Sequence, residues 1–240
     1  MASRKGFTLV ELLTVIGIIA ILMAVVSPVF AVARAAAMQN AAIQGIRQLW
    51  PATQMYAVDF DDKFFLPYYA GTESTIAWYG TEDKNGKVDI RAGLLSPYSR
   101  GFTKDATHAG LPYKGNGMGY GYNWGYLGSS AYITDDPVVM LQPTTLSSLS
   151  KPSQTIAFAT SVHYSAPWKG GDGNFYDYGF IDPVKEWRGA PSVDFRHMGM
   201  RNLDLPGKSL TSTGAAIVLF CDGSAKSRKM SQVSQAMFER

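Results

Sequence analysis

Near the N-terminus, residues 6–33 read GFTLVELLTVIGIIAILMAVVSPVFAVA, and this stretch decides the architecture of the chain. From residue 12 onward it consists mostly of Leu, Ile, Val and Ala, and as a helix this part would be about 33 Å long, enough to cross a bilayer core. Arg4 and Lys5 precede it, so the positive-inside rule predicts a cytoplasmic N-terminus. The sequence therefore predicts one membrane-spanning helix, with the rest of the chain exported.

Glu11 is the one charged residue between Lys5 and Arg34. A carboxylate in an apolar membrane helix costs on the order of 2.5–3.5 kcal/mol on insertion scales, so it needs a partner or a position near the headgroups. Two interpretations follow: Glu11 faces water at headgroup depth, or it pairs with a cationic group of a neighbouring molecule. A free α-amino group on Phe7 would serve, because Phe7 precedes Glu11 by one helical turn.

The residues around Glu11 resemble the leader and cleavage site of type IV prepilins and of type II secretion pseudoprepilins. The matching segment is Arg4-Lys5-Gly6-Phe7-Thr8-Leu9-Val10-Glu11-Leu12. The resemblance implies that a prepilin peptidase cleaves between Gly6 and Phe7 and that Phe7 is then N-methylated. It also implies that Glu11 positions each incoming subunit. Pro28 matches a proline common in family helices, where the helix loosens inside the filament.

An alternative is a general secretory signal peptide, because Ala31-Val32-Ala33 mimics a signal-peptidase site. Cleavage there would release a secreted protein that begins at Arg34. Glu11 argues against this alternative, since the hydrophobic region of such signals normally avoids charged residues. The mature N-terminus, Phe7 or Arg34, distinguishes the two.

The helix is predicted to continue beyond the membrane as an amphipathic segment over residues 34–62. Apolar positions recur every three or four residues and mark one buried face: Met38, Ala42, Ile46, Leu49, Thr53, Tyr56 and Phe60. The polar face carries Arg34, Gln44, Arg47, Gln48 and Gln54. Pro51 should kink or restart the helix, because proline lacks an N–H. Asp59, Asp61 and Asp62 mark its end, so a helix from Phe7 would be roughly 80 Å long.

From Lys63 onward, turn chemistry and short apolar runs predict a β-rich globular domain over residues 63–240. The best strand candidates are residues 155–160 and 215–221, and Asp222-Gly223 indicates a hairpin after the second. Cys221 is the only cysteine, so the core of the domain must stabilise it without an internal disulfide.

The expected fold class is α+β, with a long N-terminal helix whose outer half packs on an antiparallel sheet with long loops. The expected divisions are a leader over residues 1–6, a transmembrane and filament-core helix over 7–33, its amphipathic continuation over 34–62, and the globular domain.

The C-terminal part carries a second, shorter resemblance. Some pilin-like proteins have an Arg-His pair, a short spacer, an apolar strand and Asp-Gly, and Arg196-His197 and residues 214–223 are similar to this arrangement. Residues 56–60 and 121–124 also resemble pieces of that group. The spacing departs from the family motif, because 24 residues separate His197 from Asp222 where the motif has nine. An insertion around residues 202–213 would explain this, and it puts a joint role of His197 and Asp222-Gly223 in doubt.

Two loop patterns favour structural roles over binding sites. Tyr120, Tyr122, Trp124 and Tyr126 would share one face of a strand, and aromatic stripes pack a core more often than they stack on sugars. In the Gly-rich stretch 170–177, the side chains of Asp172, Asn174 and Asp177 suit calcium, which some pseudopilins bind. The EF-hand spacing is absent, however, so a surface turn is favoured and no cofactor is expected.

Neither a catalytic motif nor a nucleic-acid site is indicated. His108, His163 and His197 are far apart, and the sequence contains neither H-E-x-x-H nor G-x-S-x-G. Lys226, Arg228 and Lys229 form a short basic segment, for which a charge-protected sheet edge is favoured over DNA binding. The net charge of +3, from 22 basic and 19 acidic residues, is too balanced to indicate a nucleic-acid binder. We therefore expect neither enzymatic activity nor a nucleic-acid partner.

The expected function is that of a structural subunit in a type IV pilus-like or type II secretion pseudopilus filament. Expected partners are other subunits, the prepilin peptidase and methyltransferase, the inner-membrane assembly platform and membrane lipid. The chain would begin as a single-pass inner-membrane protein and end in a periplasmic or cell-surface filament. Two alternatives remain open: a minor tip pilin that binds cargo or a glycan, and a solitary anchored or secreted binding protein.

Overall fold

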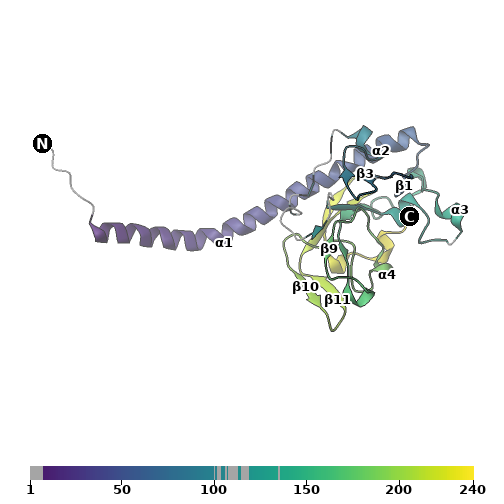
Figure 1. The fold of residues 1–240 in the computed structure, drawn as a ribbon. Coiled ribbons are helices and arrows are strands. Elements are labelled where there is room, and N and C mark those ends of the chain that lie inside the picture. Colours follow the sequence, from purple (N-terminus) through teal and green to yellow (C-terminus); the bar gives the residue numbers. More distant parts are fainter. Residues whose placement is uncertain are drawn as a thin grey trace.

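A helical rod leads into a β-rich domain in the computed structural model, which describes residues 8–99, 101, 104–105, 107, 113–114, 119–134 and 136–240 (Figure 1). The rod consists of α1 (Leu9–Arg47) followed by α2 (Leu49–Asp59). Its outer part packs on the domain, whereas its first part extends away from it (Figure 1). The α+β fold class predicted from the sequence is confirmed.

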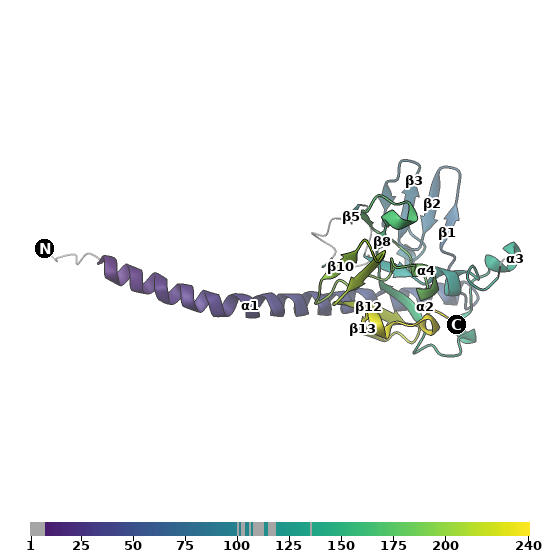
Figure 2. The same cartoon turned by 90° about the horizontal axis from the view of Figure 1, so that it is seen from below.

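The strands of the described residues form four sheets. The central sheet has the order β13-β12-β7-β6, with antiparallel neighbours throughout: β6 (Tyr120–Tyr122), β7 (Ile156–Thr160), β12 (Ala215–Phe220) and β13 (Ala225–Lys229). The second sheet is an antiparallel meander that projects outward from the domain in Figure 2: β1 (Tyr68–Ala70), β2 (Ser74–Ala77), β3 (Gly80–Asp83) and β4 (Val88–Asp89).

The two remaining sheets are small. One is a hairpin of β10 (Arg201–Asp204) and β11 (Ser209–Ser212), and the other joins β5 (Tyr113–Lys114), β9 (Phe175–Tyr176) and β8 (His163–Tyr164). The β5–β9 pair is parallel, so the sheets are not antiparallel throughout. Short helices are α3 (Pro137–Met140) and α4 (Val184–Trp187), with single turns at Ser96–Tyr98, Leu146–Ser148, Pro167–Lys169, Met230–Gln232 and Gln235–Met237.

The central sheet is buried on both faces, which explains the continuous apolar runs of β7 and β12. In β12, Ile217 and Leu219 pack toward the rod, together with Ile46 and Leu49. The alternate residues of the strand belong to a second core cluster that includes Phe238. Residues buried on both faces do not alternate with polar ones, so the strands read as unbroken apolar stretches. The predicted strands at 155–160 and 215–221 are confirmed to within one residue.

The amphipathic face predicted for the outer half of the rod is largely confirmed. The buried members are Ala42, Ile46, Leu49, Thr53 and Tyr56, and Met38 is half-buried. All five residues of the predicted polar face are exposed. Phe60 is the exception: it is 48 % exposed, because α2 ends at Asp59 and Phe60 leaves the helical register while its ring stacks on Tyr56.

The two prolines of the rod lie at different kinds of helix position. α1 ends at Arg47 and α2 begins at Leu49, so Pro51 lies in the first turn of a new helix, where a missing N–H costs nothing. This confirms the predicted restart, and the end of α2 at Asp59 confirms the predicted exit. Pro28 lies inside α1, which continues through it in the single chain. A loosened helix around Pro28 within a filament stays a prediction.

The Asp222-Gly223 hairpin is confirmed between β12 and β13. Gly223 has a φ of 82°, the left-handed conformation that glycine adopts without strain. The Asp222 carboxylate accepts a 2.8 Å hydrogen bond from the Ser224 N–H and fixes the turn. A Cβ atom on Gly223 would lie only 2.7 Å from Cδ1 of Trp50, so the turn also sits tightly against α2.

The aromatic stretch 120–126 does not form one strand, and that prediction is wrong. β6 ends at Tyr122, and the chain turns into a single π-helical turn over Trp124–Gly128. Asn123 fixes the bend, because its side-chain amide donates to the carbonyls of Ile156 and Phe238. The favoured packing role fits three of the aromatic residues, since Tyr120, Tyr122 and Tyr126 are all buried.

Candidate functional site

The first turn of α1 holds Glu11 by local hydrogen bonds. The Glu11 carboxylate accepts from the Thr8 N–H at 2.9 Å and from the Thr8 hydroxyl at 2.7 Å, and the Glu11 N–H donates to the same hydroxyl at 3.3 Å. This is a capping box, which satisfies N–H groups at the start of a helix. These bonds satisfy the carboxylate without neutralising its charge. The proposed leader and cleavage residues, Arg4, Lys5, Gly6 and Phe7, lie outside the described residues.

The first part of the rod exposes its apolar side chains on every side. Each large apolar side chain from Leu9 to Val32 is at least 45 % exposed. The helix Leu9–Asp59 is long and apolar enough to cross a membrane, judged by its length and composition, and none of its most apolar stretch is buried against the domain. Apolar surface of this extent needs lipid or other protein to cover it. The segment is therefore a surface for association with a membrane or with other helices.

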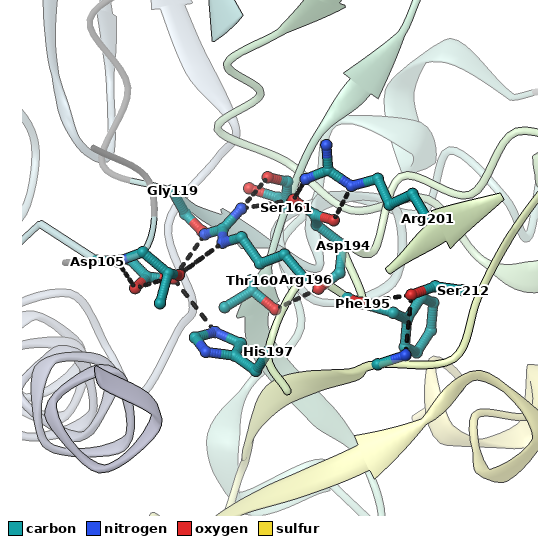
Figure 3. A network of polar contacts seen from close by, with 12 residues as sticks. Asp105, Gly119, Thr160, Ser161, Asp194, Phe195, Arg196, His197, Arg201 and Ser212 are labelled. Carbon is teal, nitrogen blue, oxygen red and sulfur yellow. Dashed lines mark hydrogen bonds and ion pairs between the residues drawn. The ribbon is translucent and has the colours of Figure 1, made fainter. Parts of the chain in front are cut away.

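A buried ionic cluster lies inside the globular domain. Arg196 lies between Asp105 and Asp194, with Arg201 on the far side of Asp194 (Figure 3). Nη2 of Arg196 is 2.7 Å from Oδ2 of Asp105, and its Nη1 is 2.7 Å from Oδ2 of Asp194. Nη2 of Arg201 is also 2.7 Å from Oδ2 of Asp194. The side chains of Arg196, Asp105 and Asp194 are at most 3 % exposed.

Electrostatics in this cluster favour the ionised form of Asp105. Burial alone would raise the pKa of Asp105, but its close contact with His197 and the positive charge of Arg196 outweigh this effect, so the pKa lies well below its ordinary value. Nε2 of His197 lies 3.3 Å from Oδ2 of Asp105. Arg196 also donates to the carbonyls of Gly119 and Ser161. The charges of Arg196 and Arg201 balance those of Asp105 and Asp194. The cluster therefore connects the chain before β6 to the segment before β10.

Sequence reasoning did not find this cluster. The C-terminal resemblance covers Arg196-His197 but neither Asp105 nor Asp194. The hydrogen-bonded partners Arg196 and Asp105 are 91 residues apart, so no local spacing could reveal the pair. The Asp-Phe-Arg-His run at 194–197 carries no local signal of burial, because charged residues are mostly exposed and are almost never fully buried unless paired.

His197 and Asp222 lie at opposite ends of β12. His197 is buried, and its backbone pairs with Ala215 at the start of the strand. Asp222 is exposed in the turn after the strand ends. Six residues of strand span about 20 Å, so the two side chains do not meet. The β10–β11 hairpin occupies the interval where an insertion was expected, and the His197–Ala215 pairing closes its base.

Because of this separation, His197 and Asp222 should contribute independently to stability. We expect the effects of His197→Leu and Asp222→Asn on the free energy of unfolding to add within about 0.5 kcal/mol in the double variant, as is usual for distant sites. Thermal unfolding of the detergent-solubilised chain, followed by tryptophan fluorescence, provides the measurement. A coupling energy above about 1 kcal/mol would show that the two residues act as a unit.

The Gly-rich stretch 170–177 forms a turn that uses its own polar groups. One Asp172 carboxylate oxygen accepts from the Asn174 N–H at 3.0 Å, and the other accepts from the Tyr176 hydroxyl at 2.6 Å. Gly170 and Gly173 have left-handed φ values of 83° and 76°. These hydrogen bonds lower the pKa of Asp172 far below its ordinary value, the Tyr176 hydroxyl contributing most. The arrangement has the features of a surface turn.

The short basic segment lies on the edge strand of the central sheet. Lys226 and Arg228 lie over the ring of Phe220 at 5.5 and 5.9 Å from its centroid. Lys229, at the end of β13, is exposed. Charged residues on an edge strand oppose pairing with strands of other chains.

A cleft of about 250 Å³ lies between residues 162–171 and 182–192. Its lining includes Lys169 and Glu186, and the Lys169 ammonium donates to the carbonyl of Trp187 at 2.7 Å. The cleft offers both charge signs to a small polar molecule, and it bears on the binding-protein alternatives.

Comparison with known proteins bears on the N-terminus alone. Residues 1–27 match the family model described as the prokaryotic N-terminal methylation motif. No curated protein and no solved structure gives a significant match to the chain. The match covers the segment in which the resemblance was seen, together with the capped start of α1 and most of its exposed apolar part. The chain therefore carries the prepilin-type leader of type IV pilins and pseudopilins.

Proposed function

We propose that the chain is a structural subunit of a type IV pilus-like or type II secretion pseudopilus filament, assembled through its N-terminal helix. The observation that carries this proposal is the exposed apolar surface from Leu9 to Val32, most of which lies within the match to the methylation motif. The motif belongs to precursors of structural subunits, and the exposed helix supplies the surface by which such subunits associate.

The proposed maturation has defined steps. The precursor enters the inner membrane with Arg4 and Lys5 on the cytoplasmic side. A prepilin peptidase cleaves between Gly6 and Phe7, and Phe7 is N-methylated. Residues 7–33 then serve as the transmembrane and filament-core helix, with 34–62 as its continuation and 63–240 as the globular domain.

Two physical terms act during assembly. Burial of apolar surface against neighbouring helices supplies cohesion at about 25 cal/mol per Å², to the extent that this surface leaves water or packs better than it did in lipid. Glu11 supplies alignment, because its charge is hydrogen-bonded by Thr8 but meets no cation among the described residues. The amino group of Phe7 on a neighbouring subunit is the cation proposed to meet it.

The test is immunogold labelling of the cell surface and of sheared or periplasmic filaments, with an antibody against the globular domain. Label along the whole length of filaments is the expected result. Label restricted to filament tips would support the minor tip pilin instead, for which the cleft beside Lys169 is the favouring observation. Abundant chain in the membrane fraction without labelled filaments would contradict both filament functions.

A further inference from the structure

Two segments of the rod expose apolar side chains beside charges of opposite sign. The first, here called the collar, contains Phe30 and Arg34, one helical turn apart on one face of α1. The second, here called the distal end, covers residues 55–62. It contains Met55 and Asp59, one turn apart on α2. Phe30 is 68 % exposed and Met55 53 %. Both segments therefore combine an uncovered apolar side chain with an exposed charge four residues later.

The apolar residues of the two segments and their charged residues are separated by the same number of positions. Phe30 and Met55 are 25 positions apart, as are Arg34 and Asp59. Placing the collar of one copy beside the distal end of another therefore matches apolar with apolar and cation with anion at once. Val58, 84 % exposed, extends the apolar part of the distal end.

The negative charges at the distal end are in an unfavourable position in a single copy of the chain. Asp59 lies in the last turn of α2, where the helix dipole disfavours anions and no basic residue is present. Asp61 and Asp62 follow with left-handed φ values of 53° and 62°, an uncommon conformation for residues other than glycine. With Lys63, the turn carries a net charge of −2. A cation from outside the chain would relieve this arrangement.

The cation of the collar is Arg34. Arg34 is exposed and makes no ion pair with another residue in the described ranges. Asp61 likewise makes no side-chain hydrogen bond there, whereas Asp59 accepts from the Tyr98 hydroxyl and Asp62 from the Ser147 N–H. Arg34 and Asp61 can therefore be changed without breaking a described contact within the domain.

We propose that the collar of one copy docks on the distal end of a second copy, with Arg34 facing Asp59 and Asp61. The inference rests on the proposed filament function and specifies its subunit contact. The contact joins two different surfaces, so each copy offers one to the copy above and the other to the copy below, and the assembly stays open-ended. The implied axial offset is about 38 Å, from 25 residues at 1.5 Å each.

The same offset covers the exposed apolar helix. Residues 9–33 of one copy lie beside residues 34–58 of the copy on which it docks, an interval in which Arg47 is the only charge after Arg34. The exposed positions of that interval include Ala37, Ala41 and Gln44, which are small or uncharged. Small residues let helices approach closely, so the outer half of the rod suits an apolar neighbour. The copy whose Phe7 amino group meets Glu11 is a different neighbour, because that contact needs an axial offset of only about one helical turn.

A charge-exchange experiment in cells tests the pairing. We expect Arg34→Glu and Asp61→Lys each to lower the yield of sheared filaments about tenfold, and the double variant to return to within about twofold of the unchanged chain. Arg47→Glu is the matched control, because Arg47 is also exposed on α1 but points to another side, 13 positions later. It should change the yield little and should not be rescued by Asp61→Lys.

Cysteine cross-linking tests the geometry directly. The natural Cys221 is buried, so oxidation should act on introduced cysteines. Arg34→Cys combined with Asp61→Cys should give a ladder of disulfide-linked multimers from assembled filaments, because each copy carries one collar and one distal end. Either single substitution, or Arg47→Cys with Asp61→Cys, should give no ladder.

The possible failures are distinguishable. If filaments labelled along their length form but show neither charge rescue nor a ladder, the docking inference is wrong and the filament function stands. If the unchanged chain forms no labelled filaments, the proposed function itself is wrong.

Discussion

A Glu11→Ala variant should reach the membrane in normal amounts and be absent from filaments. Removing the carboxylate favours membrane insertion by roughly 2.5–3.5 kcal/mol on insertion scales, so the precursor should be no less stable in lipid. The same change removes the only anion of the apolar segment, and with it the proposed partner of the Phe7 amino group. Immunoblots of membrane and sheared-filament fractions measure the two pools.

Thr8→Val is the matched control for the helix cap. It removes the hydroxyl that bonds Glu11 but keeps the carboxylate. A lost cap costs about 1 kcal/mol, which a long membrane helix tolerates. We expect Thr8→Val filaments at nearly normal yield, after confirming that the variant is cleaved. Normal incorporation of Glu11→Ala, or loss of filaments in both variants, would remove the Glu11 charge from the assembly mechanism.

Replacing Arg196 by Met should destabilise the globular domain by about 3–5 kcal/mol, because it leaves buried carboxylates without their partner. Asp105 loses its guanidinium partner, and Asp194 keeps its contact with Arg201. The measurement is the thermal unfolding of the detergent-solubilised chain. Arg91→Met is the matched control: its pair with Asp89 is exposed, so the change should cost less than about 1 kcal/mol. Equal effects of the two substitutions would show that the buried cluster adds nothing to stability.

The cluster also predicts how stability depends on pH. The folded-state pKa of Asp105 is below its ordinary value of 3.8, so its ionic contribution is complete above that value and is lost as the pH falls further below it. An Asp105→Asn variant should be less stable at neutral pH and should lose less stability than the unchanged chain on acidification below about pH 4. If the free energies of unfolding of the two chains fell in parallel between pH 5 and pH 2, this role of Asp105 would be contradicted.

Sequence patterns predicted the elements that local periodicity controls. A three-to-four-residue repeat identified the buried face from Ala42 to Tyr56, and continuous apolar runs identified β7 and β12, because both faces of that sheet are covered. Asp222-Gly223 predicted its hairpin, since the turn needs a left-handed residue.

Features set by distant contacts were not predictable in the same way. Tyr120 and Tyr126 looked like one strand, but Asn123 bends the chain through bonds to Ile156 and Phe238 that no local pattern reveals. Phe60 continued the apolar repeat beyond the residue at which the helix ends. The Arg196–Asp105 pair joins segments 91 residues apart, and only the folded chain brings them together.

The identity and modification of the first residue of the mature chain, isolated from cells, test the central claim most directly. Trimming at Gly6 is what turns a membrane anchor into an assembly-competent subunit in this account, and tandem mass spectrometry reads the first residue and its modification. The account predicts a chain that begins at N-methylated Phe7. A chain that still begins with the leader, or one that begins at Arg34, would contradict it.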